Sequence, residues 1–362
     1  MAAVDDARDR TRGCLLGGAI GDALGAPIEF ESLADIRRRD PAGVTGYLPA
    51  YGRRGAITDD TQMTLFTAEG VIRAVVRFAH RGIAHGPSVI ERAYGRWLVT
   101  QDGEHAPDAL RTDRSGWLVG VDELHHRRAP GATCLAALRA GTQGSIEHPI
   151  NGSKGCGGVM RVAPIGLTAI ADPFRMGADA AALTHGHPSG YLAAGVLAST
   201  VHQLFRGASL DGALDHATDE LVGYEGHGET LAALHAARDL ASAGRPSPEQ
   251  LEALGGGWVA EEALAIGVCC ALVATDVRDG LVLAVNHAGD SDSTGSIAGN
   301  LLGVAGGESS LPADLLADLE LRDVITTVAD DLADACWGAG VGGEYEEIDD
   351  RVAEVLRRYP GF

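Results

Sequence analysis

The sequence predicts an all-α protein that folds as a single compact multi-helix domain over residues 1–362. Most segments place apolar residues at three- and four-residue spacing, which is the helical period. Alternating β-branched runs bounded by turn residues, the mark of strands, are scarce. No repeat of 20–50 residues interrupts this pattern. Aromatic residues make up only 5% of the chain, so we expect a core of Ala, Leu, Val and Ile.

The clearest predicted helix spans residues 62–80, where Met63, Phe66, Ile72 and Val76 recur at helical spacing and Gly82 ends it. Similar patterns predict helices at 88–99, 133–140, 175–184, 190–205, 210–222, 229–243, 261–276, 295–305, 312–337 and 346–358. Glycine and proline predict loops at 40–56, 151–158, 244–250 and 337–344. The 50 glycines show no collagen period, so we expect them at turns, helix ends and close backbone approaches.

Charge and cysteine content exclude several classes of function. The 29 basic and 50 acidic residues give a net charge of −21, which disfavours binding to nucleic acid or to an anionic membrane. The six cysteines include no CxxC pair, and the start MAAVDDARDR lacks the features of a signal peptide. The most apolar run, Ala263–Ala274, is shorter than the ~20 residues of a spanning helix. We therefore expect a reduced, cytoplasmic protein, and we expect a monomer.

Two short acidic clusters each precede a predicted helix. The first is TDDT at 58–61, and the second is GDSDSTG at 289–295. Carboxylate and hydroxyl oxygens suit Mg²⁺, Mn²⁺ or Ca²⁺ and argue against zinc. If the two clusters meet in space, they form a site for two metal ions of the kind used in two-metal hydrolysis.

Helix capping is the alternative interpretation of each cluster. Asp59 followed by Gln62 matches a capping box, although capping explains one acidic residue better than two adjacent ones. An EF-hand starting at Asp290 is excluded, because it would place Leu301 where a bidentate glutamate is needed.

A glycine-rich segment at 151–161 is a candidate anion cradle. Its glycines would let backbone N–H groups approach an anion, and Ser153, Lys154 and Arg161 add donors and charge. Neither the P-loop nor the Rossmann spacing is present, so an ordinary glycine-rich connection fits the pattern as well. His185 and His187 are more typical of structural histidines than of ligands. No GxSxG elbow or credible Cys–His–Asn set occurs, which disfavours nucleophilic acyl chemistry.

Five ordered motifs between about residues 13 and 307 resemble the ADP-ribosylglycohydrolase family, which includes dinitrogenase-reductase-activating glycohydrolase. These motifs are GGAIGDALGAPIEF at 17–30, TDDT at 58–61, GGVMRVAP at 157–164, LTH at 183–185 and GDSDSTGSIAG at 289–299. The resemblance implies a compact all-α fold around a site for two Mg²⁺ or Mn²⁺ ions.

The resemblance also implies which residues form the site. The metal ligands would be Thr58, Asp59, Asp60, Asp290, Asp292 and Ser293. The catalytic residues would be Glu29, Asp60 and Asp292, with Glu29 also gating the metal site. The substrate-binding residues would be Ser153, Lys154, Gly155, Cys156, Gly157, Met160, His185 and Gly289. Three positions depart from the family pattern: Ser293 stands where threonine is commoner, Lys154 where some members have an aromatic residue, and Cys156 where many have asparagine.

The implied activity is metal-dependent hydrolysis of the glycosidic bond between ADP-ribose and an acceptor on a protein, with arginine the expected acceptor. The stretch in which arginine-directed members have guanidinium-facing carboxylates contains Asp102, Asp108, Asp113 and Asp122, and the sequence does not choose among them. Two alternatives stay open. One is a non-catalytic ADP-ribose-binding or target-masking protein on the same fold, and the other is a magnesium-dependent phosphoesterase that acts on a nucleotide-sugar.

Overall fold

The computed structural model describes residues 2–106, 115–169, 171–338 and 350–360, and within them it confirms the predicted all-α class. The α-helices are α1 (Ala2–Gly25), α2 (Leu33–Arg39), α3 (Asp59–Arg81), α4 (Gly86–Asp102), α6 (Ala132–Ala140), α7 (Ala163–Gly166), α8 (Pro173–Ala182), α9 (Pro188–Phe205), α10 (Leu210–Leu221), α11 (Gly228–Ser242), α12 (Pro248–Leu251), α13 (Ala260–Val273), α14 (Val277–Val285), α15 (Ser291–Gly306), α16 (Ala313–Asp318), α17 (Arg322–Trp337) and α18 (Asp350–Arg358). Short 3₁₀ turns are η1 (Gly103–His105), η2 (Leu118–Gly120), η3 (Asp122–His125), η4 (Cys156–Gly158), η5 (Glu252–Leu254) and η6 (Glu308–Ser310). One hairpin joins β1 (Pro49–Ala50) to β2 (Arg53–Arg54).

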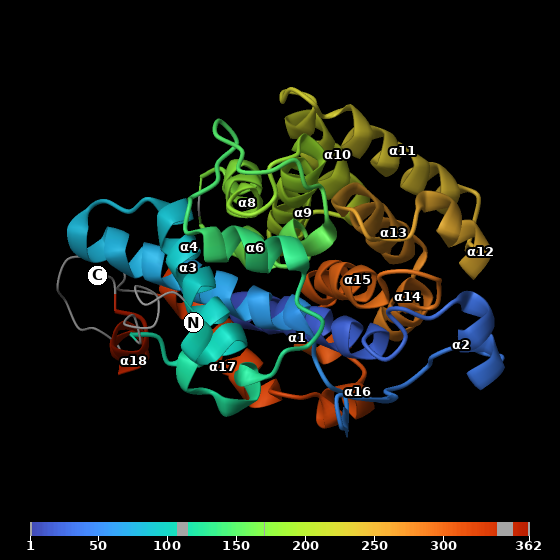
Figure 1. The fold of residues 1–362 in the computed structure, drawn as a ribbon, viewed down its shortest axis with the longest axis horizontal. Coiled ribbons are helices and arrows are strands. Elements are labelled where there is room, and N and C mark those ends of the chain that lie inside the picture. Colours follow the sequence, from blue (N-terminus) through green and yellow to red (C-terminus); the bar gives the residue numbers. More distant parts are fainter. Residues whose placement is uncertain (1, 107–114, 170, 339–349, 361–362) are drawn as a thin grey trace.

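Helices α1 and α15 form the centre of the molecule, where they pack along each other (Figure 1). Glycines face each other across this contact at four-residue spacing. A Cβ added to Gly17 would lie 2.4 Å from the carbonyl oxygen of Gly299, and one added to Gly21 would lie 2.0 Å from that of Gly295. Real Cβ atoms essentially never approach other atoms so closely, so the two backbones can touch only because both sides lack side chains.

The register of this contact is antiparallel, and it brings the end of α1 to the start of α15. The same pattern pairs Gly13 with Gly303, and Gly25 lies against the backbone of Ser291. Because residues i and i+4 share one face of a helix, the glycines form a single stripe. The C-terminal turn of α1 is therefore fixed beside the acidic segment that opens α15.

The other helices surround this central pair. Helices α17 and α3 pack on the α1 side, while α9, α13 and α14 pack against α15 (Figure 1). Buried Ala, Leu, Val and Ile form one continuous core through these contacts, as composition predicts. None of the described helices combines the length and the apolar character that crossing a membrane requires.

The sequence pattern locates most of the described helices but misses five. Helix α1 escapes detection because its glycines reduce helix propensity and blur the apolar period. Helices α2 and α14 and the single-turn helices α7 and α12 are missed as well. The helix predicted at 312–337 is wrong as one element, since Leu321 has a φ of 56° between α16 and α17. That break places Glu320 at the site described below.

We predict that Gly299→Ala destabilises the protein although alanine is the better helix former. The added Cβ would lie 2.0 Å from the carbonyl oxygen of Gly17, and forced overpacking costs about 1–3 kcal/mol. Gly46→Ala is the control, because a Cβ there meets nothing within 4 Å. Urea unfolding of both variants measures the difference. Equal stabilities of the two variants would contradict the central role of the contact between α1 and α15.

Candidate functional site

The two acidic clusters lie at the N-termini of α3 and α15, where the structure brings them together. Thr58 precedes α3, with Asp59 and Asp60 in its first turn, and all three side chains are buried. Asp290 precedes α15, and Asp292 and Ser293 follow in its first turn, also buried. Asp60 lies close enough to Asp290 and Asp292 for their charges to interact. The six predicted ligand positions therefore share one buried region.

Capping explains only part of this arrangement. The N-cap of α3 is Thr58, whose Oγ1 accepts from the amide of Asp60 at 3.3 Å. The capping box predicted from Asp59 and Gln62 is wrong, because Gln62 Oε1 instead accepts from Trp97 Nε1 at 3.2 Å. Asp290 does cap α15, accepting from the amide of Ser293 at 3.3 Å. Asp292 Oδ1 also accepts from the amide of Ser293, at 3.0 Å, whereas Asp59 Oδ2 accepts from the amide of Gly131, which lies outside α3.

The crowded carboxylates raise one another's pKa. Burial, followed by the charges of neighbouring acids, raises the pKa of Asp59, Asp60 and Asp292 well above its ordinary value. Burial together with the charges of Asp290 and Asp59 raises the pKa of Glu29 to about 9. Asp60 Oδ1 and Glu29 Oε2 are buried without a hydrogen-bond partner. Such a set of oxygen donors fits a divalent cation, which would neutralise their repulsion.

A formed metal cluster is nevertheless absent from the part of the chain that the structure describes. No group of three or more His, Cys, Asp or Glu side chains among these residues is arranged so that it could hold a metal ion. The two predicted Mg²⁺ or Mn²⁺ ions therefore stay a prediction, supported by the kind and the burial of the donors.

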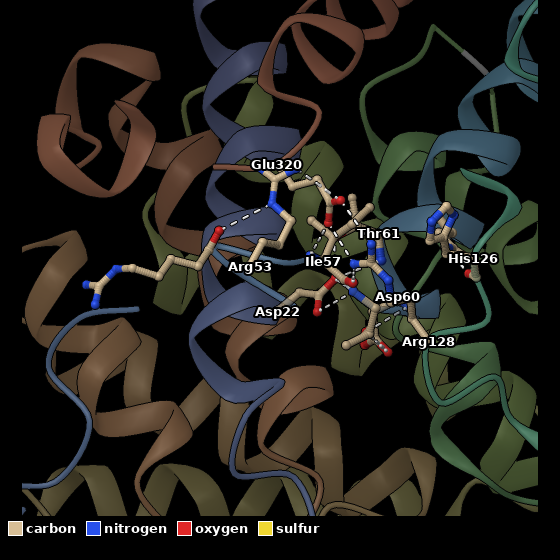
Figure 2. Close-up of polar contacts among 11 residues, drawn as sticks. Asp22, Arg53, Ile57, Asp60, Thr61, His126, Arg128 and Glu320 are labelled. Atoms are coloured by element: carbon tan, nitrogen blue, oxygen red, sulfur yellow. Dashed lines mark hydrogen bonds and ion pairs between the residues drawn. The ribbon is translucent and has the colours of Figure 1, made fainter. Parts of the chain in front are cut away.

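Asp22 is a site residue that the sequence analysis missed. It is fully buried on α1, and its carboxylate accepts from the amides of Thr58 at 3.0 Å and Thr61 at 3.1 Å (Figure 2). Thr61 Oγ1 donates to the same carboxylate at 2.5 Å. The signal was present in the GGAIGDALG segment, where one acid lies within a glycine-rich apolar stretch. Asp22 thus connects the central helix α1 directly to the start of α3.

A second buried network holds the segment that leads into α3. Arg128 donates to Glu320 through both terminal nitrogens, at 2.7 and 3.0 Å, and also to the carbonyl of Ile57 at 2.9 Å (Figure 2). Glu320 in turn accepts from the amide of Ile57 at 3.1 Å. This paired charge has its remaining donors and acceptors satisfied, which is what a buried ion pair needs to be tolerated. The acidic segment after Ile57 is therefore fixed from two sides.

The glycine-rich segment lies against the second acidic cluster. Cys156 Sγ donates to Asp290 Oδ2 at 2.8 Å, and the amide of Cys156 donates to the carbonyl of Trp258 at 3.2 Å. Lys154, which is predicted to add positive charge here, forms ion pairs with Glu229 and Glu261 through its ammonium. The segment borders the acidic site through Cys156.

Glycine is required at two of the predicted substrate-binding positions. At Gly157 a Cβ would lie 2.8 Å from Cys134 Sγ and 3.1 Å from the ring of His185. Gly289 has a φ of 146°, and a Cβ there would lie 2.0 Å from the carbonyl oxygen of Gly256. That close approach lets Gly256 accept from the amide of Asp290 at 2.8 Å.

His185 is buried next to Gly155 and Gly157 of the glycine-rich segment, and Arg161, the last residue of that segment, is buried as well. His185 Nδ1 lies 2.8 Å from Thr184 Oγ1, and burial together with the charge of Arg161 lowers the pKa of His185 to about 3. Arg161 donates to the same Thr184 oxygen at 2.7 Å and packs over the ring of Tyr94. The expectation that Arg161 offers charge to an anion is therefore wrong, since its side chain supports the fold.

Other predicted substrate-binding residues are placed around this segment. Ser153 Oγ accepts from the amide of Gly155 at 3.3 Å, and Met160 Sδ lies 3.8 Å from Ser293 Oγ.

Of the four candidate guanidinium-facing carboxylates, Asp102 forms ion pairs with Arg127 and Arg139. Asp122 is exposed on η3, and Asp108 and Asp113 lie outside the described residues. The structure does not identify an acceptor-binding carboxylate among them.

Comparisons with known proteins cover most of the chain. The sequence model of a family described as ADP-ribosylglycohydrolase matches residues 3–341. The chain is 25% identical to an ADP-ribosyl-[dinitrogen reductase] glycohydrolase from Rhodospirillum rubrum, over 87% of this chain and 91% of that protein. It is 24% identical to an ADP-ribosylarginine hydrolase, Tri1, from Pseudomonas putida, over 91% and 79%. A solved ADP-ribosylglycohydrolase-related protein complex is similar with a TM-score of 0.64 and 25% identity, over 92% of this chain and 99% of that one.

We predict that Asp22→Ala destabilises the protein by at least about 2 kcal/mol. The substitution leaves the buried amides of Thr58 and Thr61 without an acceptor, and each such loss costs about 1–3 kcal/mol. Asp211→Ala, at a largely exposed side chain, is the control and is expected to change stability by less than about 0.5 kcal/mol. Denaturant unfolding measures both changes in stability. An unfolding midpoint of Asp22→Ala equal to that of the wild type would contradict the role of Asp22 in anchoring the start of α3.

The buried state of His185 predicts a pH effect on stability. Its pKa in the folded state is about 3, below the ordinary 6.5. Below pH 6.5 the His185 side chain therefore binds a proton in the unfolded chain but not in the folded chain. Stability is therefore lost as pH falls from 6.5 towards 3. Between pH 6.5 and 5 this contribution is about 2 kcal/mol. Unfolding curves at both pH values give the free energy of unfolding that each protein loses between them. His185→Asn should lose less than the wild type by that amount, and identical losses in the two proteins would refute the low pKa of His185.

Proposed function

The chain belongs to the ADP-ribosylglycohydrolase family, and from that premise we propose that it releases ADP-ribose from ADP-ribosylated arginine on proteins with the help of divalent cations. The family and the named relatives make it an enzyme of the ADP-ribosyl-acceptor hydrolase class. One observation carries the finer proposal. Two acidic helix N-termini meet as buried carboxylates, some without hydrogen-bond partners, beside a glycine-rich segment. The arginine acceptor is supported by the similarity to an ADP-ribosylarginine hydrolase.

The residues that would hold Mg²⁺ or Mn²⁺ are Thr58, Asp59, Asp60, Asp290, Asp292 and Ser293. When bound, such cations supply positive charge that orients sugar hydroxyls and lowers the pKa of water. The chain is strongly acidic, with a net charge of −21, so a diphosphate would otherwise be repelled. All six positions carry oxygen side chains, which argues for a functional rather than a decayed site.

The protein groups have separable roles in this proposal. The glycine-rich segment, through the backbone of Gly155 and Gly157, would hold the diphosphate of ADP-ribose. Glu29, whose Oε2 is buried without a partner, would hold or deliver the proton that the leaving acceptor needs. Asp60 and Asp292 would position the attacking water. The buried position of the carboxylates would limit access of bulk water to the reacting bond.

Product analysis tests the proposal. The protein is incubated with an arginine-ADP-ribosylated protein and with a serine-ADP-ribosylated peptide, each with Mg²⁺ and with EDTA, and products are identified by mass spectrometry. Metal-dependent release of intact ADP-ribose from the arginine substrate is expected. Release of AMP or phosphate would instead indicate a phosphoesterase, and ADP-ribose binding without release would indicate a non-catalytic binding protein.

We predict that Asp292→Asn abolishes turnover and also abolishes the rise in melting temperature that Mg²⁺ gives the wild type. In EDTA the variant should be at least as stable as the wild type, because one buried charge of a crowded set is removed. Asp276→Asn is the matched control, since Asp276 caps α14 away from the site. Thermal unfolding with and without Mg²⁺ gives the comparison. A full Mg²⁺ response in Asp292→Asn would refute the ligand assignment.

A further inference from the structure

The three non-glycine residues with positive φ in the described chain gather around one buried ion pair. These residues are Tyr51, Ala129 and Leu321, with φ of 50°, 53° and 56°. The last two directly follow the partners of the pair, Arg128 and Glu320, in the sequence. The ring of the first lies 5.1 Å from the guanidinium carbon of Arg128. A residue with a Cβ loses stability in this conformation, and such residues cluster at functional sites.

Segment 128–131, which contains the arginine of this pair, contacts Asp59 at the start of α3 twice. The carbonyl of Arg128 accepts from the amide of Asp59 at 3.1 Å. The amide of Gly131 donates to Asp59 Oδ2 at 3.2 Å. Both ends of the segment therefore bind the same residue, and Ala129 lies between the two bonds in its strained conformation.

The ion pair fixes this segment to the fold. Arg128 donates to Glu320 through both terminal nitrogens and to the carbonyl of Ile57, while the amide of Ile57 donates to Glu320 (Figure 2). Arg53 adds a further donor to Glu320, at 3.2 Å. Strained backbone persists only where the surrounding structure over-determines it. These bonds supply that constraint, so segment 128–131 is held in one conformation.

The needs of α3 account for only one of the two bonds to Asp59. The first amides of a helix have no partner within it, and the carbonyl of Arg128 supplies one for the amide of Asp59. The amide of Gly131 instead holds the Asp59 side chain, a contact that helix formation does not require. A hydrogen bond to a metal-binding side chain fixes its orientation, and its loss typically lowers metal affinity about 10- to 100-fold.

We propose that segment 128–131 positions the Asp59 carboxylate for a divalent cation, with Arg128 and Gly131 as the positioning residues. The inference rests on the proposed function, because it takes Asp59 as a cation ligand. The Gly131 amide holds Oδ2, and the Arg128 carbonyl holds the backbone from which the carboxylate extends. Both residues act through Asp59 and not through the substrate.

The test removes the Gly131 amide and compares two variants at that position. Gly131→Pro deletes the donor to Asp59, and Gly131→Ala is the matched control that keeps it. Gly131 has a φ of −55°, which proline adopts, and within 4 Å a Cβ there meets only Cys134 Sγ, at 3.7 Å. Electron paramagnetic resonance measures the Kd of Mn²⁺ for each metal-free protein, well below its melting temperature. We expect Gly131→Pro to raise this Kd about tenfold and Gly131→Ala to keep it within about twofold of the wild type.

Ala129 offers a second pair of variants, which tests the same role if Gly131→Pro does not fold. Valine disfavours positive φ, so Ala129→Val should displace the segment and raise the Kd of Mn²⁺ about tenfold. Ala129→Gly should keep this Kd within about twofold of the wild type. Its melting temperature without metal should equal or exceed that of the wild type, because glycine relieves the strain.

The positioning role is overturned if Gly131→Pro binds Mn²⁺ with the wild-type Kd, or if Gly131→Ala loses as much affinity as Gly131→Pro. The second result would assign the loss to the added side chain. If Gly131→Pro does not fold, a wild-type Kd in Ala129→Val overturns the role instead. A wild-type protein that binds no Mn²⁺ would refute the cation-dependent function, and the positioning role with it. Binding by the wild type together with an unchanged Kd in Gly131→Pro would remove the positioning role alone.

Discussion

The direct backbone contact between α1 and α15 is the constraint on which the rest of the structure depends. Facing glycines such as Gly17 and Gly299 let the helices approach to a distance that any side chain would prevent. That approach fixes the register of the two helices, and the register places Asp22 near the start of α3 and Asp292 at the start of α15. Packing in the centre of the molecule thereby determines the position of charged groups at its functional site.

Those charged groups are arranged at a cost to the fold. Burial of Asp59, Asp60 and Asp292 in one region raises their pKa, because desolvation disfavours the charged carboxylates and, in addition, neighbouring like charges repel each other. Hydrogen bonds offset only part of this cost, since Asp60 Oδ1 and Glu29 Oε2 have none. Arg128 forms its ion pair with Glu320, and within the described ranges no ion pair involves a carboxylate of the two acidic clusters. A positively charged partner would relieve this repulsion, which is the reason to propose divalent cations.

Much of the site could be predicted from the sequence, because acids at helix starts and ordered motifs are local signals. The positions of Thr58 and Asp290 before their helices follow from such signals. Long-range partners could not be predicted in the same way. Lys154 pairs with Glu229 and Glu261, which are distant in the chain, and the side chain of Arg161 is buried against Thr184 instead of open to an anion. Helix α1 was missed because the glycines that make its packing possible also weaken its helical pattern.

The central claim is that the two acidic helix N-termini form one binding site for divalent cations. The most direct measurement is the stoichiometry of Mn²⁺ binding to the metal-free protein. Electron paramagnetic resonance gives it, because the technique measures the concentration of unbound Mn²⁺ during a titration. The account predicts two Mn²⁺ per chain that Mg²⁺ displaces, and loss of bound Mn²⁺ in a variant that lacks the Asp292 carboxylate. Absence of Mn²⁺ binding, or binding that persists without that carboxylate, would contradict it.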